Sequence, residues 1–135
     1  MDQRILVENQ ITDGLKLIDR LVENGVAVMA ACWLQESDGD LWYLYLVTPL
    51  VSEDEGTTPV YRRITAVIRA ISEPLWIDPF QIKVVGPWER VGQAILELQG
   101  RHASRLPTRY GEANLGGLSV EAAYIYPPTA PTPAR

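Results

Sequence analysis

The chain has 135 residues, a net charge of −5 and a 47% share of hydrophobic residues. This length suits one domain, and the amount of apolar material excludes disorder for the body of the protein. No apolar run approaches the roughly 18 residues that cross a bilayer, and the start Met1-Asp2-Gln3-Arg4 lacks the features of a secretory signal, so we expect a cytoplasmic protein without a membrane span.

Residues 2–24 are predicted to form a helix, because Ile11, Leu15, Ile18 and Val22 recur at the spacing of one helical face. Gly14 lies inside this pattern and costs about 1 kcal/mol relative to alanine. A break into two helices at Gly14 is therefore the alternative.

An aromatic hairpin is predicted next, with strands at residues 26–35 and 41–50 joined by a type I′ turn centred on Asp38-Gly39. This register places Trp33 opposite Leu44, and it gives both faces of the hairpin mostly apolar side chains. A sheet open to water on one side shows polar alternation. We therefore expect both faces to be covered.

The remainder of the chain predicts a helix from Thr58 to Glu73, a strand at residues 80–85 and a helix from Gly86-Pro87 to Gly100. Two further strands are expected at residues 106–110 and 122–126, separated by a loop around residues 115–118. The prediction is an α+β fold of order α-β-β-α-β-α-β-β, with a mostly antiparallel small sheet and helices packed on at least one face. We assign residues 1–126 to a single domain and 127–135 to a proline-rich tail.

Four aromatic residues of the hairpin are the first candidate site. Large, rigid side chains of this type dominate the energetic centres of protein interfaces. The prediction is a surface for a partner protein or for a second copy of the chain, as in a homodimer, although burial within the chain is the slightly favoured alternative. The residues are Trp33, Trp42, Tyr43 and Tyr45.

Arginine side chains form the second candidate site. One group lies in the second predicted helix, where Arg62 and Arg69 share a face, and the other lies in an acid-free segment that holds the only histidine. If the two groups meet, they make one positive surface for an anion or a nucleic acid. Solvated surface arginines are the simpler interpretation. The residues are Arg62, Arg63, Arg69, Arg101, His102, Arg105 and Arg109.

Catalytic and metal-binding residues are not predicted. The single cysteine, Cys32, lies mid-strand among apolar residues, where an inert thiol is expected, and no cluster supplies the ligands of zinc or calcium. We therefore expect no metal and no cofactor. His102 is kept as a candidate for a small hydrolase or nuclease, without a second acid or base to assist it.

Taken together, the sequence favours a non-catalytic accessory or adaptor module that acts through protein-protein interaction. An anion or nucleic-acid binder is the second hypothesis, and a hydrolase using His102 is the third. The ten arginines against two lysines further suggest a bacterial source with a GC-rich genome.

Overall fold

The computed structural model of the protein describes residues 4–101 and 108–127, with the backbone alone for 108–112. The described ranges contain three α-helices, a short 3-10 helix and five strands. The predicted order α-β-β-α-β-α-β-β and the α+β class are confirmed. The elements are α1 (Glu8–Glu23), β1 (Ala30–Glu36), β2 (Trp42–Val47), α2 (Thr58–Ala70), η1 (Pro79–Gln81), β3 (Ile82–Val85), α3 (Arg90–Arg101), β4 (Thr108–Leu115) and β5 (Leu118–Ile125).

The sheet has the strand order β3-β2-β1-β5-β4 and is antiparallel except for the parallel pair β2-β3. The predicted hairpin register is confirmed, with Trp33 opposite Leu44. The predicted type I′ turn is wrong: positive φ angles occur at Gly39 and Asp40, not at Asp38. The connection is a longer loop closed by a 2.9 Å hydrogen bond from the Glu36 amide to the Leu41 carbonyl.

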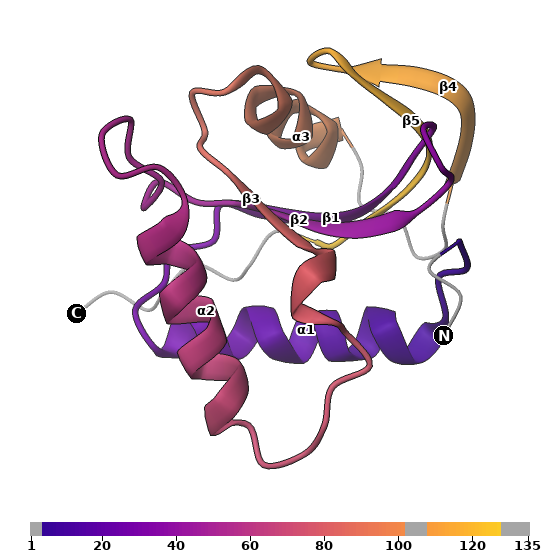
Figure 1. The fold of residues 1–135 in the computed structure, drawn as a ribbon. Helices are drawn as coiled ribbons and strands as arrows, with labels where there is room; N and C mark the ends of the chain where they lie inside the picture. Colours follow the sequence, from indigo (N-terminus) through magenta and orange to yellow (C-terminus); the bar gives the residue numbers. More distant parts are fainter. Residues whose placement is uncertain (1–3, 102–107, 128–135) are drawn as a thin grey trace.

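Helices cover both faces of the sheet, so the molecule has three layers (Figure 1). Helices α1 and α2 pack on one face, where Trp33, Trp42 and Leu44 join one core cluster. Helix α3 packs on the other face, where Cys32, Leu34 and Tyr45 join a second cluster. The expectation that an apolar hairpin needs cover on both sides is therefore confirmed, and the cover comes from the chain itself.

Helix α1 begins at Glu8 and runs unbroken through Gly14, which corrects both the predicted start and the alternative break. The buried face of α1 also differs from the predicted one, because Leu15 is 45% exposed while Gly14 and Leu17 are buried. The reason is a close approach: a Cβ atom on Gly14 would lie 2.1 Å from the hydroxyl oxygen of Tyr126. The glycine makes room for this buried tyrosine.

Helix α2 contacts the edge strand β3 through Tyr61. Its buried residues include Val60 and Ile64, which are four residues apart and so lie on one helical face. The hydroxyl of Tyr61 donates to the Ile82 carbonyl at 3.0 Å and accepts from the Val84 amide at 3.0 Å. Exposed edge strands invite pairing with other chains, and Tyr61 satisfies one carbonyl and one amide group of β3 that could otherwise take part in such pairing.

Helix α3 begins at Arg90, three residues later than predicted, so Trp88 precedes the helix, and its side chain is 46% exposed. Strands β4 and β5 are longer than predicted and form a hairpin whose turn residues, Gly116 and Gly117, have φ angles of +61° and +96°. Positive φ at both central residues is the type I′ geometry that glycine favours. Gly116 lies directly against the Arg90 carbonyl.

Candidate functional site

The four hairpin aromatics belong mainly to the core. Trp33 is fully buried, Trp42 and Tyr45 are 5% and 4% exposed, and Tyr43 is half-buried. This favours the alternative of burial within the chain, because the side chains of Trp33, Trp42 and Tyr45 are covered by the protein itself. A surface for a partner has to be sought elsewhere on the molecule.

The two arginine groups lie on different parts of the fold. Helix α2, with Arg62 and Arg69, packs on one face beside edge strand β3, whereas Arg101 ends α3 on the opposite face. Strand β4, which carries Arg109 in its backbone trace, is the other edge. His102 and Arg105 lie outside the described residues. The sheet therefore separates the arginines that are described, and they do not form one positive surface.

The described arginines also differ in the groups that they contact. Arg63 donates to the Asn24 carbonyl at 3.2 Å, which ties α2 to the end of α1. Arg101 pairs with Glu97 one turn earlier on the same helix. Arg62 and Arg69 line a shallow hollow of about 480 Å³ along α2 together with Thr65, as their seven-residue spacing predicts.

A charged cluster spans three strands on the α3 side of the sheet. The Lys83 ammonium lies 2.7 Å from the Glu36 carboxylate and 4.1 Å from the centre of the Tyr43 ring. The Tyr45 hydroxyl donates to the same carboxylate at 2.6 Å. Burial, with this hydrogen bond and the nearby negative charge, holds the pKa of Tyr45 far above its usual range. All the charges are paired, which is typical of a structural link between strands.

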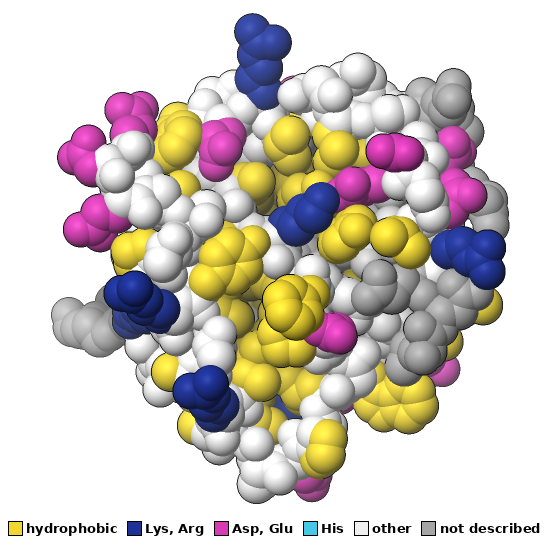
Figure 2. All heavy atoms as spheres, viewed as in Figure 1, with side chains coloured by type: hydrophobic (Ala, Val, Ile, Leu, Met, Phe, Trp, Pro, Cys, Tyr) yellow, Lys and Arg dark blue, Asp and Glu magenta, His cyan; other side chains and the backbone are white. Residues whose placement is uncertain are grey.

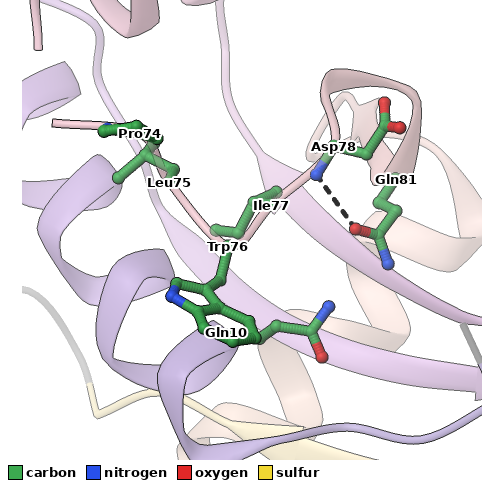
Figure 3. A pocket seen from close by; sticks show the side chains of 7 residues that line it. All are labelled: Gln10, Pro74, Leu75, Trp76, Ile77, Asp78 and Gln81. Atoms are coloured by element: carbon green, nitrogen blue, oxygen red, sulfur yellow. Dashed lines mark hydrogen bonds between the residues drawn. The ribbon is translucent and has the colours of Figure 1, made fainter. Parts of the chain in front are cut away.

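A pocket of about 480 Å³ opens between α1 and the segment that leads into β3 (Figure 3). Its walls are formed by one residue of α1, the extended residues 74–78 and one residue of η1. The lining residues are Gln10, Pro74, Leu75, Trp76, Ile77, Asp78 and Gln81. None of them was a candidate in the sequence.

The floor of this pocket holds a buried amide with an unused donor. Gln81 is 3% exposed, and its Oε1 accepts from the Asp78 amide at 3.0 Å. Its Nε2 has no hydrogen-bond partner among the described residues. Buried polar atoms in folded proteins nearly always have a partner, so the Gln81 amide is the strongest indication of a binding site in the described part of the chain.

The orientation of Gln81 is set by a capping box at the start of η1. Asp78 Oδ1 accepts from the Phe80 amide at 2.9 Å, while Gln81 reaches back to the Asp78 amide. Reciprocal bonds of this kind fix both side chains. The Gln81 carbonyl oxygen must face Asp78, and the amide nitrogen must face the pocket, where it points toward α1 in Figure 3.

Gln10 faces Gln81 from the first turns of α1 (Figure 3). It is 1% exposed, and its Oε1 accepts from the Val7 amide at 3.1 Å, which leaves Nε2 as the donor on the pocket side. Two buried amides thus present nitrogen atoms in the same pocket. Such donors suit a ligand that offers a carbonyl or carboxylate oxygen.

Exposed aromatic side chains flank the two amides. Trp76 is 49% exposed and extends from the loop toward α1 (Figure 3), and Phe80 of η1 is 90% exposed. The loop is held to α1 by a 2.7 Å hydrogen bond from the Trp76 amide to Asp13. Hydrophobic side chains also gather in the middle of the face shown in Figure 2, over η1 and β3.

Sequence reasoning missed this site because its signals look ordinary. The run Asp78-Pro79-Phe80-Gln81 matches a capping pattern at the start of a helix, and Gln10 resembles a solvent-facing helix residue. A glutamine on the buried side of α1, aligned with Leu17 and Leu21, was the available clue. The significance of this glutamine depends on which residues pack against it, and the sequence of one helix does not show which residues those are.

No protein-family model, curated protein or solved structure matches this chain. Within residues 4–101 and 108–127, no helix is both long and apolar enough to cross a membrane. Over the same residues, no three His, Cys, Asp or Glu side chains lie close enough together to hold a metal ion.

Proposed function

We propose that the chain is a non-catalytic binding module that holds a partner protein at the pocket between α1 and η1. The observation that carries the proposal is the unpartnered Nε2 of the buried Gln81. A buried donor without an acceptor lowers the stability of the free protein, whereas a ligand that supplies the acceptor regains a hydrogen bond.

The surroundings of the pocket suit a protein better than a small enclosed ligand. Trp76 and Phe80 keep much of their apolar surface in water. Exposed aromatic residues are enriched at the energetic centres of protein interfaces, and their apolar area extends the contact beyond the pocket itself. This is the role that the sequence had suggested for the hairpin aromatics, now proposed for a different pair of residues.

The experiment compares two exposed tryptophans. Purified wild-type protein and the variants Trp76→Ala and Trp88→Ala are used to capture proteins from extracts of the native cell, and light scattering measures the mass of each variant alone. We expect a captured protein, or a second copy of the chain, that Trp88→Ala retains and Trp76→Ala loses. The proposal is refuted if neither capture nor self-association is seen, or if both are equal for the two variants.

A second candidate function is anion binding along α2, favoured by the shared hollow of Arg62, Thr65 and Arg69. Guanidinium groups bind phosphate oxygens strongly, and such binding weakens steeply with salt. A labelled single-stranded DNA should bind wild type and the control Arg20→Ala equally and should bind an Arg62→Ala/Arg69→Ala variant less. Binding that is insensitive to salt refutes this candidate.

We further propose that the module acts in the bacterial cytoplasm, for the compositional reasons given above. The hydrolase hypothesis on His102 stays a prediction, because that residue lies outside the described ranges. An undiminished activity in a His102→Ala variant would remove it.

A further inference from the structure

We infer that the partner places one uncharged amide carbonyl in the pocket, where its oxygen accepts hydrogen bonds from both Gln81 Nε2 and Gln10 Nε2. The inference rests on the proposed function and specifies the chemistry of the group that is bound. The carbonyl belongs either to the main chain of the partner or to an asparagine or glutamine side chain, since both sources offer the same acceptor.

The amide nitrogens of the two glutamines are directed into the same space. Each glutamine reaches back with its Oε1 to the backbone amide that precedes its helix, Gln10 to Val7 at 3.1 Å and Gln81 to Asp78 at 3.0 Å. These bonds fix the oxygen end of each side chain and turn both Nε2 groups into the pocket, where they point toward one another (Figure 3). Because a carbonyl oxygen has two lone pairs, one oxygen between the two nitrogens can accept from both.

The charges around the pocket favour a neutral acceptor over an anion. None of the residues that line the pocket is a lysine or an arginine. The one acidic residue among them, Asp78, directs its carboxylate away from the pocket (Figure 3). A carboxylate or phosphate that entered would lose its water and gain only uncharged donors, and burial of an unpaired charge costs more free energy than burial of a neutral polar group. A carbonyl uses the same donors without that cost.

The hydrogen bonds of the two glutamines also disfavour a ligand that donates. The Oε1 atoms of Gln10 and Gln81 already accept from backbone amides, whereas the buried Nε2 of Gln81 has no partner among the described residues. Lysine and arginine side chains offer only donors. A hydroxyl group can accept, but it brings a proton that needs an acceptor of its own. A carbonyl oxygen satisfies the free donors and adds no further donor at that end of the ligand.

An apolar wall lies beside the two amides. Pro74, Leu75 and Ile77 line the same pocket, and the latter two pack against the core cluster beneath α1 and α2. An aliphatic group attached to the carbonyl would leave water when it contacts this wall, which is favourable. A short aliphatic amide therefore reproduces the part of the partner that the pocket would hold.

The test titrates the isotope-labelled full chain with four small probes and follows the side-chain NH₂ signals of the glutamines by proton–nitrogen NMR. The probes share a branched aliphatic body and differ in the polar head: isovaleramide is a primary amide, N-methylisovaleramide a secondary amide, isovalerate an anion and isoamylammonium a cation. The primary amide represents an asparagine or glutamine side chain, and the secondary amide represents a main-chain peptide group.

Three variants accompany the wild type. Gln10→Glu and Gln81→Glu each keep an oxygen that accepts from the backbone amide but remove the donor, and each assigns one NH₂ signal by its loss. Gln93→Glu makes the same change at an exposed position of α3 and is the matched control. Far-UV circular dichroism verifies that each variant retains the fold.

We expect the amides to shift the NH₂ signals of both Gln10 and Gln81 in the wild type and in Gln93→Glu, with dissociation constants on the order of 1–10 mM for ligands this small. Isovalerate and isoamylammonium should bind at least about tenfold more weakly, and each of the other two variants should bind the amides at least about tenfold more weakly. A response to either amide supports the inference, and the stronger of the two responses identifies the source of the carbonyl.

Three results overturn the inference. The first is a pair of NH₂ signals that neither amide shifts, which would mean that water alone bridges the two glutamines. The second is an anion or a cation that binds as tightly as the amides. The third is undiminished affinity for the amides in either Gln10→Glu or Gln81→Glu. If Gln81→Glu does not fold, the wild-type titrations and Gln10→Glu decide.

The proposed function and this inference fail in different ways. Capture of a partner that depends on Trp76, together with glutamine signals that no amide shifts, leaves the proposed function standing and overturns this inference. Loss of Trp76-dependent capture and self-association overturns the proposed function itself, whatever the small amides do.

Discussion

Replacement of Gly14 by alanine should destabilise this protein, although the same change stabilises most helices. In the middle of an exposed helix, alanine is better than glycine by about 1 kcal/mol. Here the new methyl group would lie 2.1 Å from the Tyr126 hydroxyl and 3.2 Å from Trp33 Nε1. That hydroxyl accepts from Trp33 Nε1 at 2.9 Å and donates to the Ile11 carbonyl at 2.6 Å.

The expected loss follows from these contacts. Displacement of the Tyr126 ring leaves the buried indole N–H of Trp33 without a partner, at a cost of about 1–3 kcal/mol. Overpacking of the core adds about 1–3 kcal/mol. After the helix gain is subtracted, Gly14→Ala should lower the free energy of unfolding by about 3 kcal/mol, which moves the urea midpoint down by about 2 M at an m value of about 1.5 kcal/mol/M.

A double-mutant cycle with Tyr126→Phe tests whether the loss of stability comes from steric overlap between the new methyl group and the Tyr126 hydroxyl. Tyr126→Phe removes the hydroxyl whose place the new methyl takes, so the double variant should be more stable than the sum of the single changes predicts, by about 1–3 kcal/mol. Gly100→Ala is the matched control, because a Cβ atom there meets nothing within 4 Å. Unfolding in urea, followed by circular dichroism, measures all four variants.

Two results would refute this reasoning about Gly14. One is a Gly14→Ala variant as stable as wild type or as Gly100→Ala. The other is strict additivity between Gly14→Ala and Tyr126→Phe, which would mean that the methyl group and the hydroxyl do not compete for the same space.

Three further predictions concern the core, the sheet edge and the second hairpin. Burial raises the pKa of both the Cys32 thiol and the Tyr45 hydroxyl, so the folded chain keeps protons that the unfolded chain releases. The resulting contribution to stability is complete below about pH 9 and is lost as the pH rises above it. A urea midpoint that is the same below and above about pH 9 contradicts this prediction. Tyr61→Phe should cost about 1–3 kcal/mol and increase association through the β3 edge, and a variant that stays as stable and as monodisperse as wild type in thermal unfolding and light scattering refutes this. Gly116→Ala should lower the melting temperature more than Gly117→Ala, because only the former places a Cβ atom against backbone, 2.3 Å from the Arg90 carbonyl; the reverse order would show that φ strain dominates.

Much of the local structure could be predicted from the residues themselves. The hairpin register followed from the alternation of side chains and from the position of the turn, because a shift by one residue would reverse both faces. The buried face of α2 is also local in origin, because Val60 and Ile64 are four residues apart, which is the spacing of one helical face. The turn type was wrong, since Asp38-Gly39 is compatible with several loop geometries and the backbone placed positive φ one residue later.

The face of α1 shows where local spacing is insufficient. Ile11, Leu15, Ile18 and Val22 form a regular stripe in the sequence, yet the helix is rotated so that Leu15 faces solvent. The rotation brings Gly14 against Tyr126, a residue more than 100 positions away. Helical periodicity cannot reveal which small residue a distant aromatic side chain requires.

The sequence by itself determined the element order, the hairpin register and the need to cover both faces of an apolar sheet, because these depend on periodicities of a few residues. Only the tertiary structure decided that α1 and α2 take one face and α3 the other, which separates the arginines of α2 from Arg101 and buries Trp33, Trp42 and Tyr45 of the hairpin. It also decided the candidate site: the Gln81 amide becomes unusual only when α1 and residues 74–78 close around it and remove it from water. Whether a polar atom lacks a partner depends on everything packed against it, and those neighbours come from distant parts of the chain.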